Sequence, residues 1–182
     1  ALGGAGTQPA ALGFAGRAHN GDLPPANRTE SWNGSSWSEQ NDLSTARRSL
    51  GSCGTNANAL AFAGNTGSPT TATEEWSTTQ PVGAWSSLPA LNTARTGTAA
   101  AGTTTNAIVF AGALDPGPGP VANVESWNGS AWTETTDVNS ARVSLGGSGT
   151  YTAAIGAGGY TTTAQALTET WNGSAWTETG DL

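Results

Sequence analysis

Paired carboxylates are the first residues of this sequence that could carry out chemistry. Glu30 and Glu39 flank one short turn, and Glu125 and Glu134 flank another. A glycosidase places two carboxyl groups on either side of one scissile bond, so each pair has suitable residue types. The same arrangement recurs along the chain, however, and an active site would then have to recur with it. We therefore interpret these carboxylates as polar residues of outer strands and predict a protein that is not an enzyme, with no catalytic residue.

Metal and nucleophile chemistry is restricted by the counts of histidine and cysteine. His19 is the single histidine, and Cys53 is the single cysteine. One histidine excludes a His-rich metal site, and one cysteine excludes a disulfide within the chain. Asp115 begins a run of prolines and glycines that offers too few oxygen ligands for calcium. The sequence therefore predicts no metal site, no cofactor and no Ser-His-Asp triad.

Charge and hydropathy exclude two further classes of partner. The 182 residues contain six Arg, no Lys and 13 Asp plus Glu, which gives a net charge of −7. A nucleic-acid-binding surface needs clustered cations, and no apolar run approaches the roughly 20 residues of a membrane-spanning helix. We expect no nucleic-acid partner and no membrane insertion. The lack of an initiator Met, with no signal peptide in its place, favours a processed chain or an excerpt from a longer one.

Internal repeats organise the chain. The phrase Glu-Ser-Trp-Asn-Gly-Ser-Ser-Trp, or a variant of it, ends at Trp37, Trp85, Trp132 and Trp176, with spacings of 48, 47 and 44 residues. A Thr/Ser-Ala-Arg landmark and a Phe-Ala-Gly landmark keep the same register. Such a period defines one repeat architecture rather than several domains. We predict a single domain, 1–182, made of four repeats at approximately 1–49, 50–97, 98–144 and 145–182.

Each repeat has the pattern of four short antiparallel strands. The first segment is rich in Gly, Ala, Ser and Thr, and the second is a short apolar run that ends in glycine. The third segment runs into one Trp, and the fourth starts at the next. Asn-Gly between them predicts a type I′ hairpin turn, and no segment has the apolar spacing of a helix. The expected first strands are 3–7, 51–55, 99–103 and 146–150, and the expected second strands are 11–15, 59–63, 107–111 and 154–158.

Four strands per repeat at this period predict an all-β fold, a β-propeller of four blades. Small residues suit the innermost strands, which converge on the axis. Large rings are expected where blades face each other, because each blade must bury both faces of its sheet. The tryptophans are therefore predicted to form the structural core: Trp32, Trp37, Trp76, Trp85, Trp127, Trp132, Trp171 and Trp176.

The repeat resembles the kelch repeat. The sequence pattern of that family contains an Arg near the first strand, a glycine pair after the second strand, Glu-x-aromatic in the third strand and a Trp in the fourth. Here the matching elements of one repeat are Arg47, Ala63-Gly64, Glu74-x-Trp76 and Trp85, and the resemblance covers essentially the whole chain. Three of the four glycine pairs read Ala-Gly, and Trp replaces the usual Tyr. These departures resemble a divergent kelch-like group, similar to virion and surface proteins of phages and bacteria.

One end of the predicted propeller is the expected recognition surface. The connections from second to third strand vary most between repeats, at residues 17–26, 65–71, 113–120 and 160–165. Variable loops on a rigid scaffold are a common place for binding. The residues predicted to bind a ligand lie in these loops or beside them: Arg17, His19, Asp22, Arg47, Arg95, Asp115, Arg142 and Tyr160. The alternative for the three arginines that recur, Arg47, Arg95 and Arg142, is a scaffold role, each pairing with a neighbouring loop or a repeat Glu.

The function that these features favour is binding without catalysis. We expect a binding or adhesion module at an extracellular or virion surface, which recognises a glycan or a protein through its loop face. The alternatives are a structural subunit that decorates or caps a fibre or particle, in contact with other copies of its assembly, and a carbohydrate-active enzyme. Three arrangements of blades stay open: a closed four-bladed ring, part of a longer array, or two chains in one eight-bladed ring. Four Asn-x-Ser/Thr sequons, at Asn27, Asn33, Asn128 and Asn172, leave glycosylation open.

Overall fold

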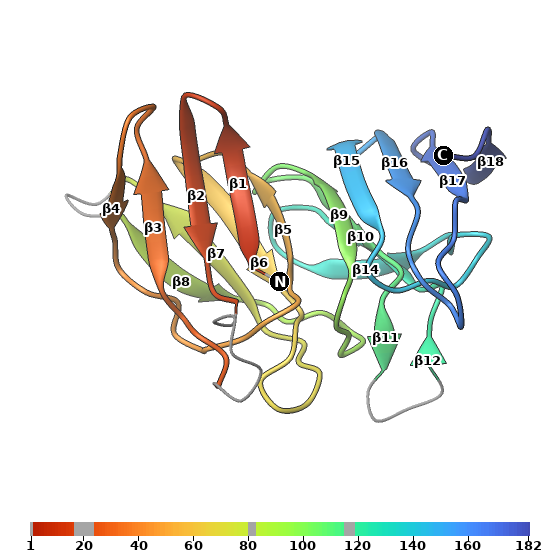
Figure 1. Ribbon diagram of the computed structural model, residues 1–182, viewed down its shortest axis with the longest axis horizontal. Coiled ribbons are helices and arrows are strands. Elements are labelled where there is room, and N and C mark those ends of the chain that lie inside the picture. Colours follow the sequence, from red (N-terminus) through yellow and green to blue (C-terminus); the bar gives the residue numbers. More distant parts are fainter. Residues whose placement is uncertain (1, 17–23, 80–82, 115–118) are drawn as a thin grey trace.

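The computed structural model describes residues 2–16, 24–79, 83–114 and 119–182. These residues form strands and connecting segments, and none of them form a helix. Consequently, no helix in this part of the chain is long and apolar enough to span a membrane. Four antiparallel sheets of four strands follow one another along the chain and form the four blades of a β-propeller, which confirms the predicted fold (Figure 1).

Each blade is built from one continuous stretch of chain. Blade 1 contains β1 (Gly3–Thr7), β2 (Ala10–Phe14), β3 (Thr29–Trp32) and β4 (Trp37–Glu39). Blade 2 contains β5 (Gly51–Gly54), β6 (Asn58–Phe62), β7 (Thr73–Ser77) and β8 (Ala84–Leu88). Blade 3 contains β9 (Ala99–Gly102), β10 (Ala107–Phe110), β13 (Val124–Trp127) and β14 (Trp132–Thr135), with a small hairpin of β11 (Ala113–Leu114) and β12 (Gly119–Pro120). Blade 4 contains β15 (Gly146–Thr150), β16 (Ala153–Ala157), β17 (Thr168–Trp171) and β18 (Trp176–Thr179).

The second strand of each blade ends where the backbone turns left-handed. Ala15, Ala63 and Ala111 have φ values of 61°, 57° and 58°, and the glycine after each also has a positive φ. A residue with Cβ pays a steric cost in this region, and blade 4 avoids that cost because it has glycine at both positions, Gly158 and Gly159. The second strands therefore stop at Phe14, Phe62 and Phe110, one residue before the expected ends.

The outer hairpins differ from the expected type I′ turn. Four residues separate the paired tryptophans of β3 and β4, and only the glycine, Gly34, has a positive φ, of 95°. Asn33 instead accepts hydrogen bonds at Oδ1 from the backbone N–H groups of Ser35 and Ser36, both at 3.0 Å. The Asn side chain thus replaces a backbone acceptor, as Asn commonly does in turns. The same bonds recur at Asn128 and Asn172, so the type I′ prediction was wrong.

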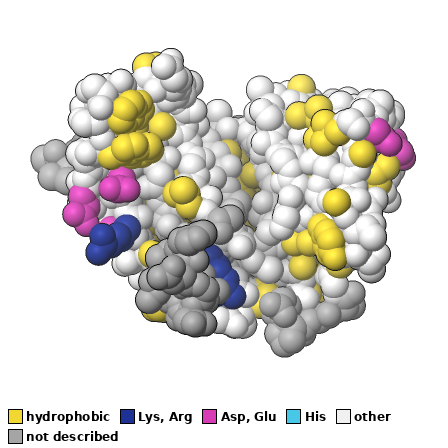
Figure 2. All heavy atoms as spheres, in the orientation of Figure 1, with side chains coloured by type: hydrophobic (Ala, Val, Ile, Leu, Met, Phe, Trp, Pro, Cys, Tyr) yellow, Lys and Arg dark blue, Asp and Glu magenta, His cyan; other side chains and the backbone are white. Residues whose placement is uncertain are grey.

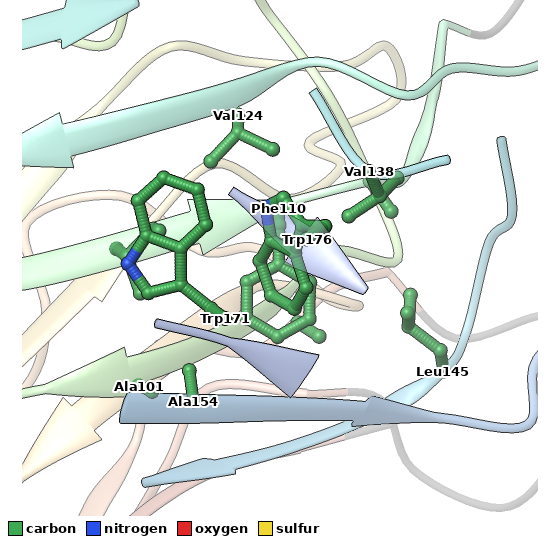
Figure 3. Close-up of a cluster of buried hydrophobic side chains, with 11 residues drawn as sticks. Ala101, Phe110, Val124, Val138, Leu145, Ala154, Trp171 and Trp176 are labelled. Carbon is green, nitrogen blue, oxygen red and sulfur yellow. The ribbon is translucent and has the colours of Figure 1, made fainter. Parts of the chain in front are cut away.

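Aromatic rings join neighbouring blades. In blades 1 to 3, the Phe at the end of the second strand packs against the fourth-strand Trp of the following blade, with ring centroids 4.8 Å apart for Phe14–Trp85 and 5.3 Å apart for Phe62–Trp132. Phe110 meets Trp176 at 4.7 Å in the cluster between blades 3 and 4 (Figure 3). Each fourth-strand Trp also contacts the third-strand Trp of its own blade. Indoles therefore form much of the core between blades, as the repeat spacing predicted.

Small residues let the inner strands approach each other closely. A Cβ built on Gly147 of β15 would lie 2.9 Å from the backbone N and O of Ala100 in β9. Such a contact requires glycine, so the Gly-rich first strands have the predicted steric reason. The inner strands of all four blades line a shallow hollow of about 260 Å³.

The side of the molecule between blade 4 and blade 1 is open. Inner strands contact each other from β1 to β5, β5 to β9 and β9 to β15, and Figure 2 shows the surface hollowed between the two halves of the molecule. Trp37 is 52% exposed, although its counterparts Trp132 and Trp176 are each 6% exposed. The prediction that Trp37 belongs to the core was therefore wrong, because no blade of this chain covers it.

Candidate ligand-binding face

The loops between second and third strands emerge at one end of the propeller, the lower end in Figure 1. We call this end the loop face; its described part consists of residues 65–71, the hairpin β11–β12, residues 160–165 and the segments that follow each fourth strand. Antiparallel pairing places these connections together, because the chain enters and leaves every blade at this end. The loops that differ most between repeats thus share one surface.

Each described loop is attached to the segment that leads into the next blade. Asn65 exchanges two backbone hydrogen bonds with Arg48, at 2.8 and 3.0 Å, and Ala113 exchanges two with Thr96. Tyr160 does the same with Val143. Because these bonds recur at the same position in three blades, the backbone under the loop face is fixed by the scaffold rather than by each loop sequence.

Buried ion pairs lie beneath the loop face and connect the segments that support it. Arg95 lies 2.8 Å from Glu125, and both side chains are almost fully buried. Arg95 also donates from Nη1 to the carbonyl of Ala111, at 3.1 Å, and to the carbonyl of Asn123. The second oxygen of Glu125 accepts the backbone N–H of Asn92, at 2.7 Å. The Arg95–Glu125 pair thus connects the third strand of blade 3 with the end of its second strand and with the segment that leads into it from blade 2.

Blades 2 and 4 contain the corresponding buried ion pair. Arg47 pairs with Glu74 at 3.1 Å, and Arg142 pairs with Glu169 at 2.8 Å. Burial lowers the pKa of Arg47 and of Arg95, while the neighbouring carboxylate partly offsets that effect. All three arginines have fully buried side chains. A buried and paired guanidinium cannot meet a ligand in this structure, so we leave these arginines out of the proposed surface and assign them to the scaffold.

The remaining predicted binding residues have different positions. Arg17, His19, Asp22 and Asp115 lie outside the described residues. Tyr160 is 49% exposed and is the large hydrophobic residue that the described loops between second and third strands expose. Around it and in the loop of blade 2 lie exposed hydroxyl side chains: Thr66, Ser68, Thr162 and Thr163. The described loops between second and third strands of blades 2, 3 and 4 are therefore uncharged and polar, with one exposed aromatic ring, while the segments after the fourth strands add the exposed carboxylates of Asp42, Asp137 and Asp181.

The Glu125–Glu134 pair is bonded to neighbouring side chains and Cys53 is buried, whereas Glu30 and Glu39 of blade 1 are both exposed. Glu125 and Glu134 lie opposite each other on the paired strands β13 and β14. Glu125 forms an ion pair with Arg95, and Glu134 accepts a hydrogen bond from Asn123, at 2.9 Å. Burial raises the pKa of the Cys53 thiol to about 12, so this thiol is not a nucleophile near neutral pH. Among the residues described, no group of three or more His, Cys, Asp or Glu side chains is arranged to hold a metal ion.

Sequence reasoning missed a second hollow, of about 420 Å³, on the open side of blade 1. It is lined by Leu2, Gly13, Arg28, Glu30 and Trp37, among others. The signal that could have found it is the repeat register, because it matches these residues to side chains that are buried in the following blades.

The fold and the loop face together define a β-propeller with a rigid scaffold and a varied end surface. A scan against protein-family models finds no match for the chain, and a search among curated proteins finds no relative. Function therefore has to be argued from the chain's own residues.

Proposed function

We propose that this chain is a binding module without catalytic activity, and that its loop face recognises a glycan or a protein at an extracellular or virion surface. The observation that carries the proposal is the contrast between a repeated scaffold and unrepeated loops. Buried Arg–Glu pairs and paired backbone bonds connect the loop bases of blades 2, 3 and 4 at the same positions, while the loop sequences differ between blades. Such an arrangement suits recognition by surface side chains.

The chemistry of the described loops between second and third strands favours an uncharged polar ligand. Hydroxyl groups from Thr66, Ser68 and Thr162 can donate and accept hydrogen bonds, and the exposed ring of Tyr160 offers a flat apolar surface. Sugars present the same combination of hydroxyl groups and apolar ring faces. The low content of charged residues, 10%, also suits a surface exposed to variable salt, since screening weakens ion pairs.

The kelch-like pattern is part of this proposal. The recurring Arg, the glycine pair or its Ala-Gly variant, Glu-x-Trp and the fourth-strand Trp each have a structural role in the blades described above. We propose that the repeat is a divergent kelch-like repeat, and that the chain resembles surface and virion proteins built from such repeats.

A glycan array with the labelled chain tests the proposal, with a pull-down on intact particles or cells as the arm for protein partners. Tyr160→Ala should reduce binding at least tenfold, because the variant removes the exposed ring. Thr177→Ala is the matched control; it alters an exposed residue of the outer strand of the same blade and should bind like the unaltered chain. The proposal is wrong if neither arm detects binding, or if binding is unaffected by Tyr160→Ala and by replacement of residues 65–71.

A further inference from the structure

Four of the five large hydrophobic residues that the described chain exposes lie on the outward sides of its two end blades, and the fifth, Tyr160, lies on the loop face. Leu2 and Trp37 are 65% and 52% exposed on blade 1, and Ile155 and Leu182 are 40% and 82% exposed on blade 4. We call these surfaces the blade 1 end face, formed by Leu2, Gly13 and Trp37, and the blade 4 end face, formed by Ile155, Ala157, Thr168 and Leu182. Exposed apolar residues that gather on one surface often mark an interaction site.

The blade 1 end face has the shape of an acceptor for another blade. Leu2, Gly13 and Trp37 correspond in the repeat to Leu50, Ala61 and Trp85 of blade 2. There, Phe14 of blade 1 fills the space among these residues, within the cluster that joins the two blades. The hollow of about 420 Å³ on blade 1 is the same space without a ring from a preceding blade.

The blade 4 end face has the complementary, donor half of an interface between blades. Leu182 corresponds to Leu43, because each donates its backbone N–H to the segment before the third strand, at 3.0 and 2.9 Å. Leu43 is 1% exposed, since the following blade covers it, whereas Leu182 has no such cover. Ile155 corresponds in the same way to Leu60 and to other second-strand residues that are fully buried.

Each end face carries one partner of a hydrogen bond that forms between other blades of the chain. Trp85 and Trp132 donate from Nε1 to Oγ1 of Thr29 and Thr73 on the preceding blade, at 2.9 and 3.1 Å. Thr168 is the equivalent threonine of blade 4, and its buried Oγ1 has no hydrogen-bond partner. Trp37 is the equivalent tryptophan of blade 1. The unpaired Thr168 acceptor is thus one half of a bond whose other half is the exposed indole.

We infer that a second copy of this chain docks its blade 4 end face onto the blade 1 end face, and that the reciprocal contact closes a ring of eight blades. The occupant follows from the residues, because the two faces are the two halves of an interface that this chain builds three times internally. A head-to-tail contact of this kind either closes into a ring or continues as a filament. The open side shared by blades 1 and 4 favours closure (Figure 1).

One residue difference between the blades makes the contact between copies weaker than the contacts within the chain. Ala157 stands where Phe14, Phe62 and Phe110 stand in the other blades, so the hollow on blade 1 receives no aromatic ring from blade 4. Each copy also carries a net charge of −7, which opposes association and is screened by salt. We therefore expect reversible, concentration-dependent pairing that strengthens as salt is added.

Sedimentation velocity over a range of concentrations tests the inference. The chain should pass from a monomer of 18.1 kDa to a species of twice that mass, with nothing larger. Trp37→Glu and Ile155→Glu should each prevent pairing, while Tyr160→Glu, an exposed aromatic on the loop face, should pair normally. Circular dichroism of each variant shows whether the blades remain folded.

Mixing the two defective variants distinguishes the possible contacts. The Trp37→Glu chain keeps an intact blade 4 end face, and the Ile155→Glu chain keeps an intact blade 1 end face. A head-to-tail contact therefore predicts that the mixture forms heterodimers although neither variant pairs alone. A monomer at all concentrations, an open series of oligomers, or pairing that is lost only with Trp37→Glu would each overturn the inference.

Discussion

Trp132→Ala should remove a large part of the contact between blades 2 and 3. Trp132 is 6% exposed; its ring lies 5.3 Å from Phe62 of the preceding blade and 5.3 Å from Trp127 of its own. Truncating a buried aromatic to Ala usually destabilises a protein by about 3–5 kcal/mol. The lost bond to Thr73, at 3.1 Å, adds about 1 kcal/mol, because its buried Oγ1 then has no donor. We expect a loss of about 4–5 kcal/mol, in the upper part of that range.

Urea unfolding followed by circular dichroism measures this loss, because the variant itself changes the tryptophan fluorescence. The control is Thr133→Ala, which alters the next residue of β14, whose side chain is exposed. Surface substitutions of this kind change stability by no more than about 0.5 kcal/mol. A Trp132→Ala variant that unfolds at the same urea concentration as this control would refute the inter-blade role of the indole.

Three further perturbations have expected outcomes that stability measurements and thiol labelling can check. Val124→Thr should stabilise the chain by about 1 kcal/mol in urea unfolding, because it gives the buried and unbonded Nε1 of Trp176 a threonine hydroxyl as acceptor, as Thr73 provides for Trp132. A loss of stability would contradict this interpretation. Glu125→Gln should destabilise by about 3–5 kcal/mol, since it leaves a buried guanidinium unpaired, while Glu30→Gln, at an exposed equivalent, should have little effect; equal effects would refute the assigned role. Burial raises the pKa of Cys53 to about 12 from 9.0, so the neutral thiol favours the folded state below pH 9 and this contribution is lost as the pH rises toward 12. Cys53→Ala should remove that part of the pH dependence, and iodoacetamide should label the native thiol far more slowly than the unfolded one; rapid native labelling at pH 8 would contradict the burial.

The sequence predicted the blades because their cause is local and repeated. The spacing of Trp37, Trp85 and their counterparts defined the repeat, and the Gly-rich first strands indicated where the blades converge. The ends of the second strands were predicted one residue too late, since an alanine at a left-handed position looks like a strand residue. The Asn-Gly turn was misjudged for a related reason: the Asn side chain, rather than its backbone, completes the turn.

The features that sequence reasoning could not assign depend on contacts between repeats. The recurring Arg95 suggested either a ligand contact or a scaffold pair, and only the packing of its loop around Glu125 separates the two. The exposure of Trp37 follows from which blades meet, because its repeat position is the same as that of buried tryptophans. The exposure of Tyr160 and of the hydroxyl side chains beside it likewise depends on which loop residues point outward.

A crystal structure of the chain tests the radial arrangement most directly, through the place of each indole. Our account predicts four sheets in chain order around one axis, with Trp85, Trp132 and Trp176 each lying against the phenylalanine of the sheet before it. Sheets stacked along a line, or these three indoles directed into solvent, would contradict it.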